Sequence, residues 1–227
     1  MLGFNNKILR YNQKWIKPWV DPLNPLNLPP NTVRVRTSDG EPPRKLVDYT
    51  SYETAVLVPG TTDVYDVYKS GTSFRNLLYN SDNLVEVLGA NTTGITDMRS
   101  MLLGITGMQS VQLFDTSSVT DMSYMFKNAE GLTSIPLFDT SSCTNMANMF
   151  EDCTYLTSVP LFDTSKVTNM DYMFYECIRV ESGALALYQQ ASGQTSPPSN
   201  HYRTFYGCGR YSTSGAEELA QIPDDWK

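Results

Sequence analysis

The sequence predicts an α+β repeat solenoid, with repeats of 24 residues, a small N-terminal β cap and a C-terminal capping rung. One observation is a fixed period, because one phrase recurs between about residues 71 and 188 without a change of spacing. A fixed period of 20 to 50 residues is typical of stacked repeats that bury their apolar faces against one another. A second observation is that apolar side chains keep their places in every copy. The methionines of one such register are Met98, Met122, Met146 and Met170.

Residues 1–30 are predicted to form an attachment arm and a proline-rich linker. Several prolines lie between Pro18 and Pro30, which restricts φ and favours an extended, semi-rigid chain. Aromatic side chains ahead of such a linker are suited to docking on a partner; a strand or loop folded back on its own domain is the alternative. The candidate docking side chains are Phe4, Tyr11, Trp15 and Trp19.

Residues 31–70 are predicted to form the small β cap. Residues 32–37 alternate apolar and polar side chains, which is typical of a half-buried strand. Short strands and turns are expected to continue through 54–58 and 63–68. Such a cap would cover the first repeat, whose open edge would otherwise expose unpaired backbone groups.

Residues 71–190 are predicted to hold the repeats, each with one short helix and one short strand. Apolar residues at i, i+3, i+4 and i+7 indicate one buried face of a helix, and Asp121 stands at the expected N-cap. The segment 132–137 predicts a short strand that ends or bends near Pro136. In this copy the apolar helical positions are Met122, Met125, Phe126 and Ala129.

Residues 191–227 are predicted to form the C-terminal cap, as one further repeat preceded by an inserted helix. That helix is expected over 184–191, and a serine- and proline-containing loop over 193–200. Phe205 and Cys208 then repeat the spacing of earlier copies, and a second helix is expected to begin near Ser214.

Composition argues against two classes of partner. The net charge is -7 and the pI is about 4.7, whereas nucleic-acid binding favours a basic surface, so we expect no nucleic-acid partner. No stretch approaches the roughly 20 apolar residues of a membrane span, so we expect none. The first 20 residues also lack the continuous apolar core of a secretory signal peptide.

Sequence motifs predict no enzyme activity, no catalytic residues and no cofactor. His201 is the only histidine, and no nucleophile, zinc or phosphate-loop motif is present. Stacked carboxylates could hold Ca²⁺ along one edge, but each can instead accept hydrogen bonds from the amides of its own turn, which we favour. These carboxylates are Asp115, Asp139 and Asp163.

Four cysteines are present, and we expect them to be small buried thiols. They occupy positions that hold Ala, Ile or Val in other copies, which indicates apolar core positions. A disulfide between adjacent repeats is the alternative. The cysteines are Cys143, Cys153, Cys177 and Cys208.

Positions that vary from copy to copy provide a candidate recognition surface. Variable side chains on a fixed frame are typical of a recognition face, although a solvated face would vary just as freely. Tyrosine is suited to recognition because it offers a large, rigid contact area. The candidate residues are Tyr124, Asn148, Tyr172, Tyr175, Tyr202, Tyr206 and Tyr211.

The segment 138–153, Phe-Asp-Thr-Ser-Ser-Cys-Thr-Asn-Met-Ala-Asn-Met-Phe-Glu-Asp-Cys, is followed by Leu156 and Val159 and resembles the BspA-like class of leucine-rich repeats. The resemblance covers about half of the chain and is carried by three consecutive copies. It implies a right-handed solenoid on a bacterial surface protein that adheres to host proteins or to other cells.

The flanking segments 8–15 and 28–40 resemble the openings of repeat proteins encoded by bacteriophages of gut bacteria. This resemblance implies a tail or head fibre whose residues 1–30 bind other virion proteins. The expected function is therefore that of a non-enzymatic virion protein that binds a host cell-surface protein or glycan. A bacterial surface or secreted adhesin is the alternative, and a homo-oligomer is left open.

Overall fold

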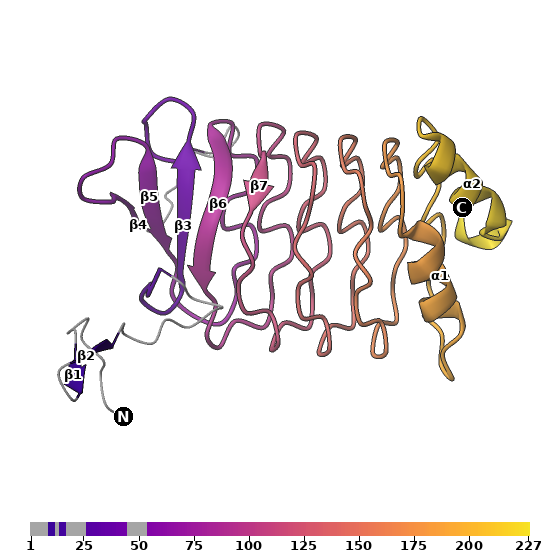
Figure 1. Ribbon diagram of the computed structural model, residues 1–227, viewed down its shortest axis with the longest axis horizontal. Coiled ribbons are helices and arrows are strands. Elements are labelled where there is room, and N and C mark those ends of the chain that lie inside the picture. Colours follow the sequence, from indigo (N-terminus) through magenta and orange to yellow (C-terminus); the bar gives the residue numbers. More distant parts are fainter. Residues whose placement is uncertain (1–8, 12–13, 17–25, 45–53) are drawn as a thin grey trace.

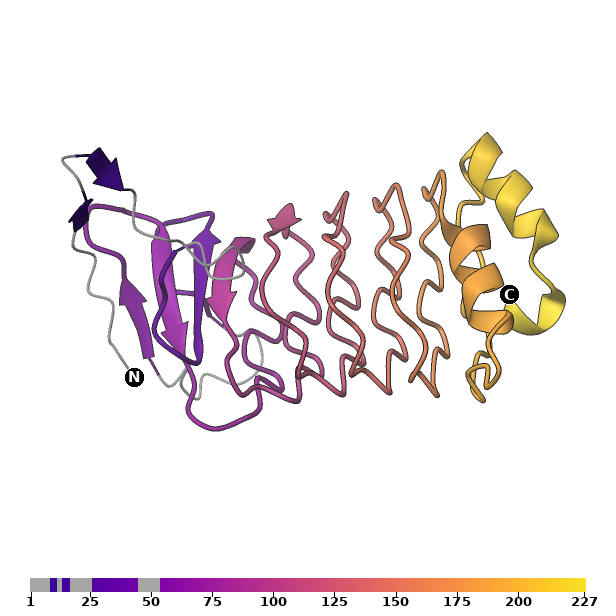
Figure 2. The ribbon, with the colours of Figure 1, turned by 60° about the horizontal axis from the view of Figure 1, so that its bottom comes forward.

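The computed structural model describes residues 9–11, 14–16, 26–44 and 54–227. Figure 1 shows an elongated arrangement in which a β-sheet is followed by successive coils of chain, with two helices at the far end. The view in Figure 2 shows the same succession, so the coils lie side by side between the sheet and the helices. The chain therefore runs along the long axis, and positions far apart in sequence meet at regular intervals.

The main sheet has five strands in the order β4-β5-β3-β6-β7. All neighbouring strands are antiparallel except β6 and β7, which are parallel, so the sheet is mixed. A separate antiparallel pair is formed by β1 (Leu9–Tyr11) and β2 (Lys14–Ile16). The strands of the main sheet are β3 (Thr32–Thr37), β4 (Thr54–Leu57), β5 (Val64–Tyr68), β6 (Leu84–Asn91) and β7 (Ser110–Val111).

Strand β3 shows why this part of the sequence forms a sheet. Val33 and Val35 point to one face and are fully buried, whereas Arg34 points to the other face and pairs with Asp66 of β5 at 2.6 Å. Alternation with a period of two thus places apolar side chains in the core and charged pairs outside. The strands expected around 32–37, 54–58 and 63–68 are confirmed as β3, β4 and β5.

From residue 72 onward the chain repeats its hydrogen bonding every 24 residues. The amide of Thr120 donates to the carbonyl of Thr96 at 2.8 Å, and the amide of Thr144 donates to Thr120 at 2.9 Å. Isolated parallel bridges join Asp97 to Asp121 and Asp121 to Asn145. We call residues 73–182 the turn stack, because its coils, apart from β6 and β7, are built of turns and are bonded to the coils on either side.

The predicted fold class, an α+β repeat solenoid, is wrong. The regular secondary structure of the described residues is one mixed five-stranded sheet, the β1–β2 pair, two α-helices of nine residues each and one 3₁₀ turn. Neither α-helix lies within 122–137, where a short helix and a short strand were expected. Strand β3 pairs with β6, and β6 pairs with β7, so residues 32–37 share one sheet with the first periodic coils.

The helix prediction fails because turns can reproduce helical spacing. Tyr124 and Asn128 have φ near 60°, and a residue with this left-handed backbone cannot continue a right-handed helix. The amide of Met125 instead closes a turn onto Met122 at 3.2 Å. A positive φ at the third residue of a four-residue turn is typical of type II. The apolar residues are still buried, but the carboxylate of Asp121 accepts from Ser123 in a local turn instead of capping a helix.

A column of stacked phenylalanine rings fills the core of the turn stack. Phe126 and Phe150 lie 5.3 Å apart between ring centroids, and Phe150 and Phe174 lie 5.2 Å apart. Phe205 extends the column, with its ring 6.0 Å from Phe174 and nearly parallel to it. Such pairs contribute about 0.5–1.5 kcal/mol each beyond the burial of area, so the column ties neighbouring coils together.

The four cysteines are free and buried, as predicted. The thiols of Cys153 and Cys177 donate to the carbonyls of Phe126 and Phe150 at 3.2 and 3.1 Å. Burial raises the pKa of all four thiols, and it raises the pKa of Cys143 to about 11. They are therefore neutral core groups at physiological pH.

The C-terminal segment adds helices α1 (Ala184–Ser192) and α2 (Thr213–Gln221), which confirms both expected helices. Between them, Asn200 bridges Asn169, and the amide of Phe174 donates to Thr204 at 2.8 Å. This segment therefore continues the backbone hydrogen bonding between successive coils after the insertion of α1. The division into the four predicted segments stays a prediction.

Helix α2 is held against the turn stack and against α1. The carboxylate of Glu218 accepts from the amides of Gly183 and Leu185 at 3.3 and 3.1 Å. An anionic group there stabilises the N-terminal end of α1. A β-carbon at Gly215 would lie 2.0 Å from the carbonyl oxygen of Val180, so only glycine permits this approach.

Candidate functional site

Four tyrosines and one arginine gather where the turn stack meets the C-terminal segment. Tyr172 contacts Tyr202 and Tyr175 edge-on, with ring centroids 5.5 Å apart in both pairs. Tyr175 stacks on Tyr206 at 5.1 Å. The guanidinium of Arg203 lies 5.1 Å from the ring centroids of both Tyr202 and Tyr206. We call these five residues the tyrosine cluster.

The backbone ladder places these side chains next to one another. The amide of Tyr172 donates to Tyr202 at 2.9 Å, which aligns the two levels of the cluster. Tyr172 and Arg203 have φ of 56° and 53°. For a residue other than Gly, Asn or Asp, this left-handed backbone costs about 1–2 kcal/mol, and such strain is often found at functional sites. The same left-handed backbone recurs at Ser100, Tyr124 and Asn148, so it belongs to the turn of every coil and does not single out this surface.

Two other predicted recognition residues, Tyr124 and Asn148, occupy the same position of the 24-residue period as Tyr172. Tyr124 is 37% exposed with φ of 60°, but no ring contact joins it to the cluster among the described residues. Asn148 is only 9% exposed and donates to Glu151, so it presents little surface to a partner. Tyr211 is 72% exposed and lines a different site, described below.

Two of the four predicted docking residues of the arm lie beyond what the structure describes. Phe4 and Trp19 are outside the described residues. Tyr11 belongs to β1 and Trp15 to β2, which pair antiparallel. Their role in attachment stays a prediction.

The stacked aspartates form local turns, as favoured from the sequence. Asp115, Asp139 and Asp163 accept from the amides two residues ahead at 2.8–2.9 Å. Hydrogen bonds from Ser141 and Ser165 hold the pKa of Asp139 and Asp163 below the usual value. Within the described residues, no group of three acidic, histidine or cysteine side chains is placed to hold a metal. The ring of His201 stacks on Trp226, with centroids 4.3 Å apart.

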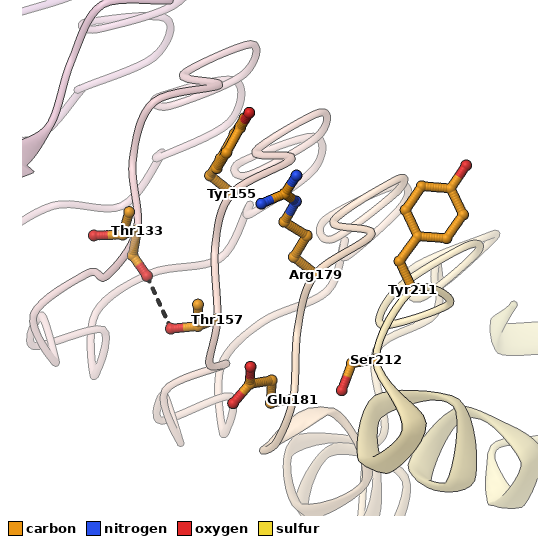
Figure 3. A pocket seen from close by; sticks show the side chains of 7 residues that line it. All are labelled: Thr133, Tyr155, Thr157, Arg179, Glu181, Tyr211 and Ser212. Atoms are coloured by element: carbon orange, nitrogen blue, oxygen red, sulfur yellow. Dashed lines mark hydrogen bonds between the residues drawn. The ribbon is translucent and has the colours of Figure 1, made fainter.

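A second site is an open pocket of about 530 Å³ (Figure 3). In Figure 3, Tyr155 and Tyr211 stand on either side of Arg179, and Glu181 lies lower in the pocket near Ser212. The guanidinium of Arg179 lies over the ring of Tyr155, 4.1 Å from its centroid. The lining residues are Thr133, Tyr155, Thr157, Arg179, Glu181, Tyr211 and Ser212.

Sequence reasoning identified only Tyr211 among the residues of this pocket. Tyr155 and Arg179 also occupy one position of the 24-residue period and differ between copies. The same argument from variable positions would have selected them. The sequence did not show that the C-terminal segment brings Tyr211 and Ser212 to the pocket that Tyr155 and Arg179 line.

Together, the ladder and these surfaces define a repeat protein that carries exposed aromatic side chains on a periodic backbone. Residues 65–188, more than half of the chain, match the family described as "Mycoplasma protein of unknown function, DUF285", and the chain belongs to this family. The match supports the coarser part of the resemblance, to a family of surface repeat proteins, and does not show a phage origin.

Searches of curated proteins and of solved structures found no match. Within the part of the chain that the structure describes, no helix is both long and apolar enough to cross a membrane.

Proposed function

We propose that this protein is a non-enzymatic binding protein that presents the tyrosine cluster to a host cell-surface protein or glycan. The observation that carries the proposal is the gathering of four tyrosines and Arg203 on one surface, with Tyr202 53% and Tyr206 40% exposed. Tyrosine and arginine are enriched among residues that dominate binding energy, because they offer large contact areas and directed hydrogen bonds.

Preorganisation supports the same proposal. The rings contact one another, and the ladder fixes their backbones, so binding would order few side chains. An immobilised side chain otherwise costs about 0.5–1.5 kcal/mol on association.

Binding of the full chain to arrays of extracellular proteins and glycans tests this function. The variant Tyr202→Ala/Tyr206→Ala should bind at least about tenfold more weakly, a loss of about 1.4 kcal/mol. Tyr68→Ala removes an equally exposed tyrosine from β5, outside the cluster, and should leave binding unchanged. Equal losses in the two variants, or no binding by the unmodified chain, would contradict the proposal.

For the location of the protein, we propose a virion, with residues 1–30 attached to other virion proteins and the turn stack directed toward the host. A bacterial surface or secreted adhesin is the second candidate, and the family match favours it because the family description names Mycoplasma. Mass spectrometry of purified phage particles and of proteins labelled on intact cells distinguishes the two. Detection in particles supports the first, and labelling on cells free of particles supports the second.

A further inference from the structure

We propose that the open pocket between Tyr155, Arg179 and Tyr211 binds a neutral saccharide unit. The pocket shares no residue with the tyrosine cluster, so this inference adds a second site to the proposed function and can be tested separately. Arg210 lies between the two sites: it pairs with Glu176 at 2.7 Å, beside Tyr175, and lies 5.3 Å from the ring of Tyr211.

The walls of the pocket are held by the backbone. The amide of Thr157 donates to Thr133 at 3.1 Å, and the amide of Glu181 donates to Thr157 at 2.8 Å, so three successive coils form one continuous surface. Tyr211 is fixed by its amide, which donates to Ile178 at 2.9 Å. Ser212 is fixed as the N-cap of α2, accepting from Gly215 at 3.2 Å. A volume of about 530 Å³ is within the ordinary range for small-molecule sites.

Arg179 and Glu181 are charged, and neither forms a salt bridge with another described residue. Arg99 pairs with Asp121 at 3.2 Å, whereas no carboxylate among the described residues lies within salt-bridge distance of Arg179. The carboxylate of Glu181 likewise has no ion pair or hydrogen bond within the described part of the chain. Stacking on Tyr155 holds the Arg179 guanidinium in place, and its N–H edge stays available to donate.

These groups fit the chemistry of a neutral sugar. A sugar hydroxyl both donates and accepts, so it can accept from Arg179 and donate to Glu181. One face of a sugar ring is apolar and can lie against Tyr211, which is 72% exposed. The two opposite charges balance locally, and the chain carries a net charge of -7, so an anionic ligand would gain little from its surroundings.

Titration of the full chain with glucose, galactose, mannose and N-acetylglucosamine tests the site, with sialic acid as the charged comparator. Ligand-observed NMR and calorimetry should detect at least one neutral sugar with Kd on the order of 1 mM, as befits an open site. The absence of binding to all four neutral sugars, or tighter binding of sialic acid, would overturn the proposal.

Three variants locate the binding. Arg179→Ala and Tyr211→Ala should each weaken sugar binding by at least about tenfold. Both side chains are exposed, so their melting curves should match that of the unmodified chain. Lys166→Ala removes an exposed positive charge elsewhere and should leave affinity unchanged. An unaltered Kd in Arg179→Ala would place the sugar outside this pocket.

The tyrosine-cluster variant separates this result from the proposed function. Tyr202→Ala/Tyr206→Ala should bind the arrays at least about tenfold more weakly but bind the sugar with an unchanged Kd. Loss of sugar binding in that variant would mean that the two surfaces act as one site, and the inference of a separate pocket would fail.

Discussion

The tyrosine cluster and the pocket use the same residue types in opposite arrangements. In the cluster the rings touch one another, and Arg203 lies over two of them. In the pocket no ring contact joins Tyr155 to Tyr211 among the described residues, and Arg179 stands between them. Contact between rings gives a continuous surface suited to a large partner. Separation leaves room for a small one.

The two surfaces also rest on different supports. The cluster shares its coils with the phenylalanine column, because Phe174 lies between Tyr172 and Tyr175 in the chain and Tyr206 follows Phe205. The pocket depends on how α2 docks, because Ser212 begins that helix and Gly215 lies against the backbone of Val180. It should therefore be possible to disturb one surface and spare the other.

The largest effect is expected from Phe174→Ala, because this variant weakens the turn stack that supports both surfaces. The ring is fully buried between Phe150 and Phe205, so its removal should cost about 3–5 kcal/mol in the free energy of unfolding. Chemical denaturation measures the loss, and Phe174→Leu, which retains most of the volume, should lose much less. A cost below about 1 kcal/mol for the alanine variant would show that the column does not support the stack.

Gly215→Ala should disturb the pocket and spare the cluster. The added methyl group meets the carbonyl of Val180, and such overpacking costs about 1–3 kcal/mol. Thermal unfolding should show this loss, and binding in the pocket should weaken because Ser212 and Tyr211 shift. Ala220→Ser, at an exposed position of the same helix, is the control and should change neither. Loss of array binding through the cluster would contradict separate supports.

Tyr124 and Tyr172 occupy the same position of the 24-residue period, but only Tyr172 belongs to the tyrosine cluster. Tyr124→Asn and Tyr172→Asn therefore make the same change outside and inside the cluster. Asn tolerates a left-handed backbone, so Tyr124→Asn should stabilise the fold by about 1 kcal/mol. In Tyr172→Asn the same gain is opposed by two lost ring contacts, each contributing about 0.5–1.5 kcal/mol. Denaturation curves should therefore show a higher free energy of unfolding for Tyr124→Asn than for Tyr172→Asn. Equal stabilities would mean that the ring contacts contribute nothing.

The smallest effect on stability is expected from acid, through two hydrogen-bonded carboxylates of the turn stack. The pKa values of Asp139 and Asp163 are lowered in the folded chain by hydrogen bonds from Ser141 and Ser165. Their stabilisation is therefore fully present above the unfolded pKa of about 3.9 and is lost as the pH falls through the lower folded values. Unfolding measured between neutral pH and pH 2 should show this decline, and Asp139→Asn/Asp163→Asn should flatten it. An unchanged slope in that variant would assign the decline to other groups.

The sequence predicted the period, the buried columns and the β-strands of 32–68, because these depend on which side chains are apolar. It did not predict the turns, because Met122, Met125, Phe126 and Ala129 have the spacing of a helix and only the φ of Tyr124 and Asn128 excludes one. Four of the candidate recognition residues do come together, but Asn148 is buried by its neighbours. The pocket was missed because Arg179 and Tyr211 meet through an insertion that interrupts the period.

The most direct test of the central claim, that binding depends on the assembled tyrosine cluster, is array binding by the full chain with Tyr172→Asn beside Tyr124→Asn. The two variants change the same residue type at the same backbone geometry, and only Tyr172 contacts the other tyrosines. The account predicts binding at least about tenfold weaker for Tyr172→Asn and unchanged binding for Tyr124→Asn. Equal binding by the two variants would contradict it.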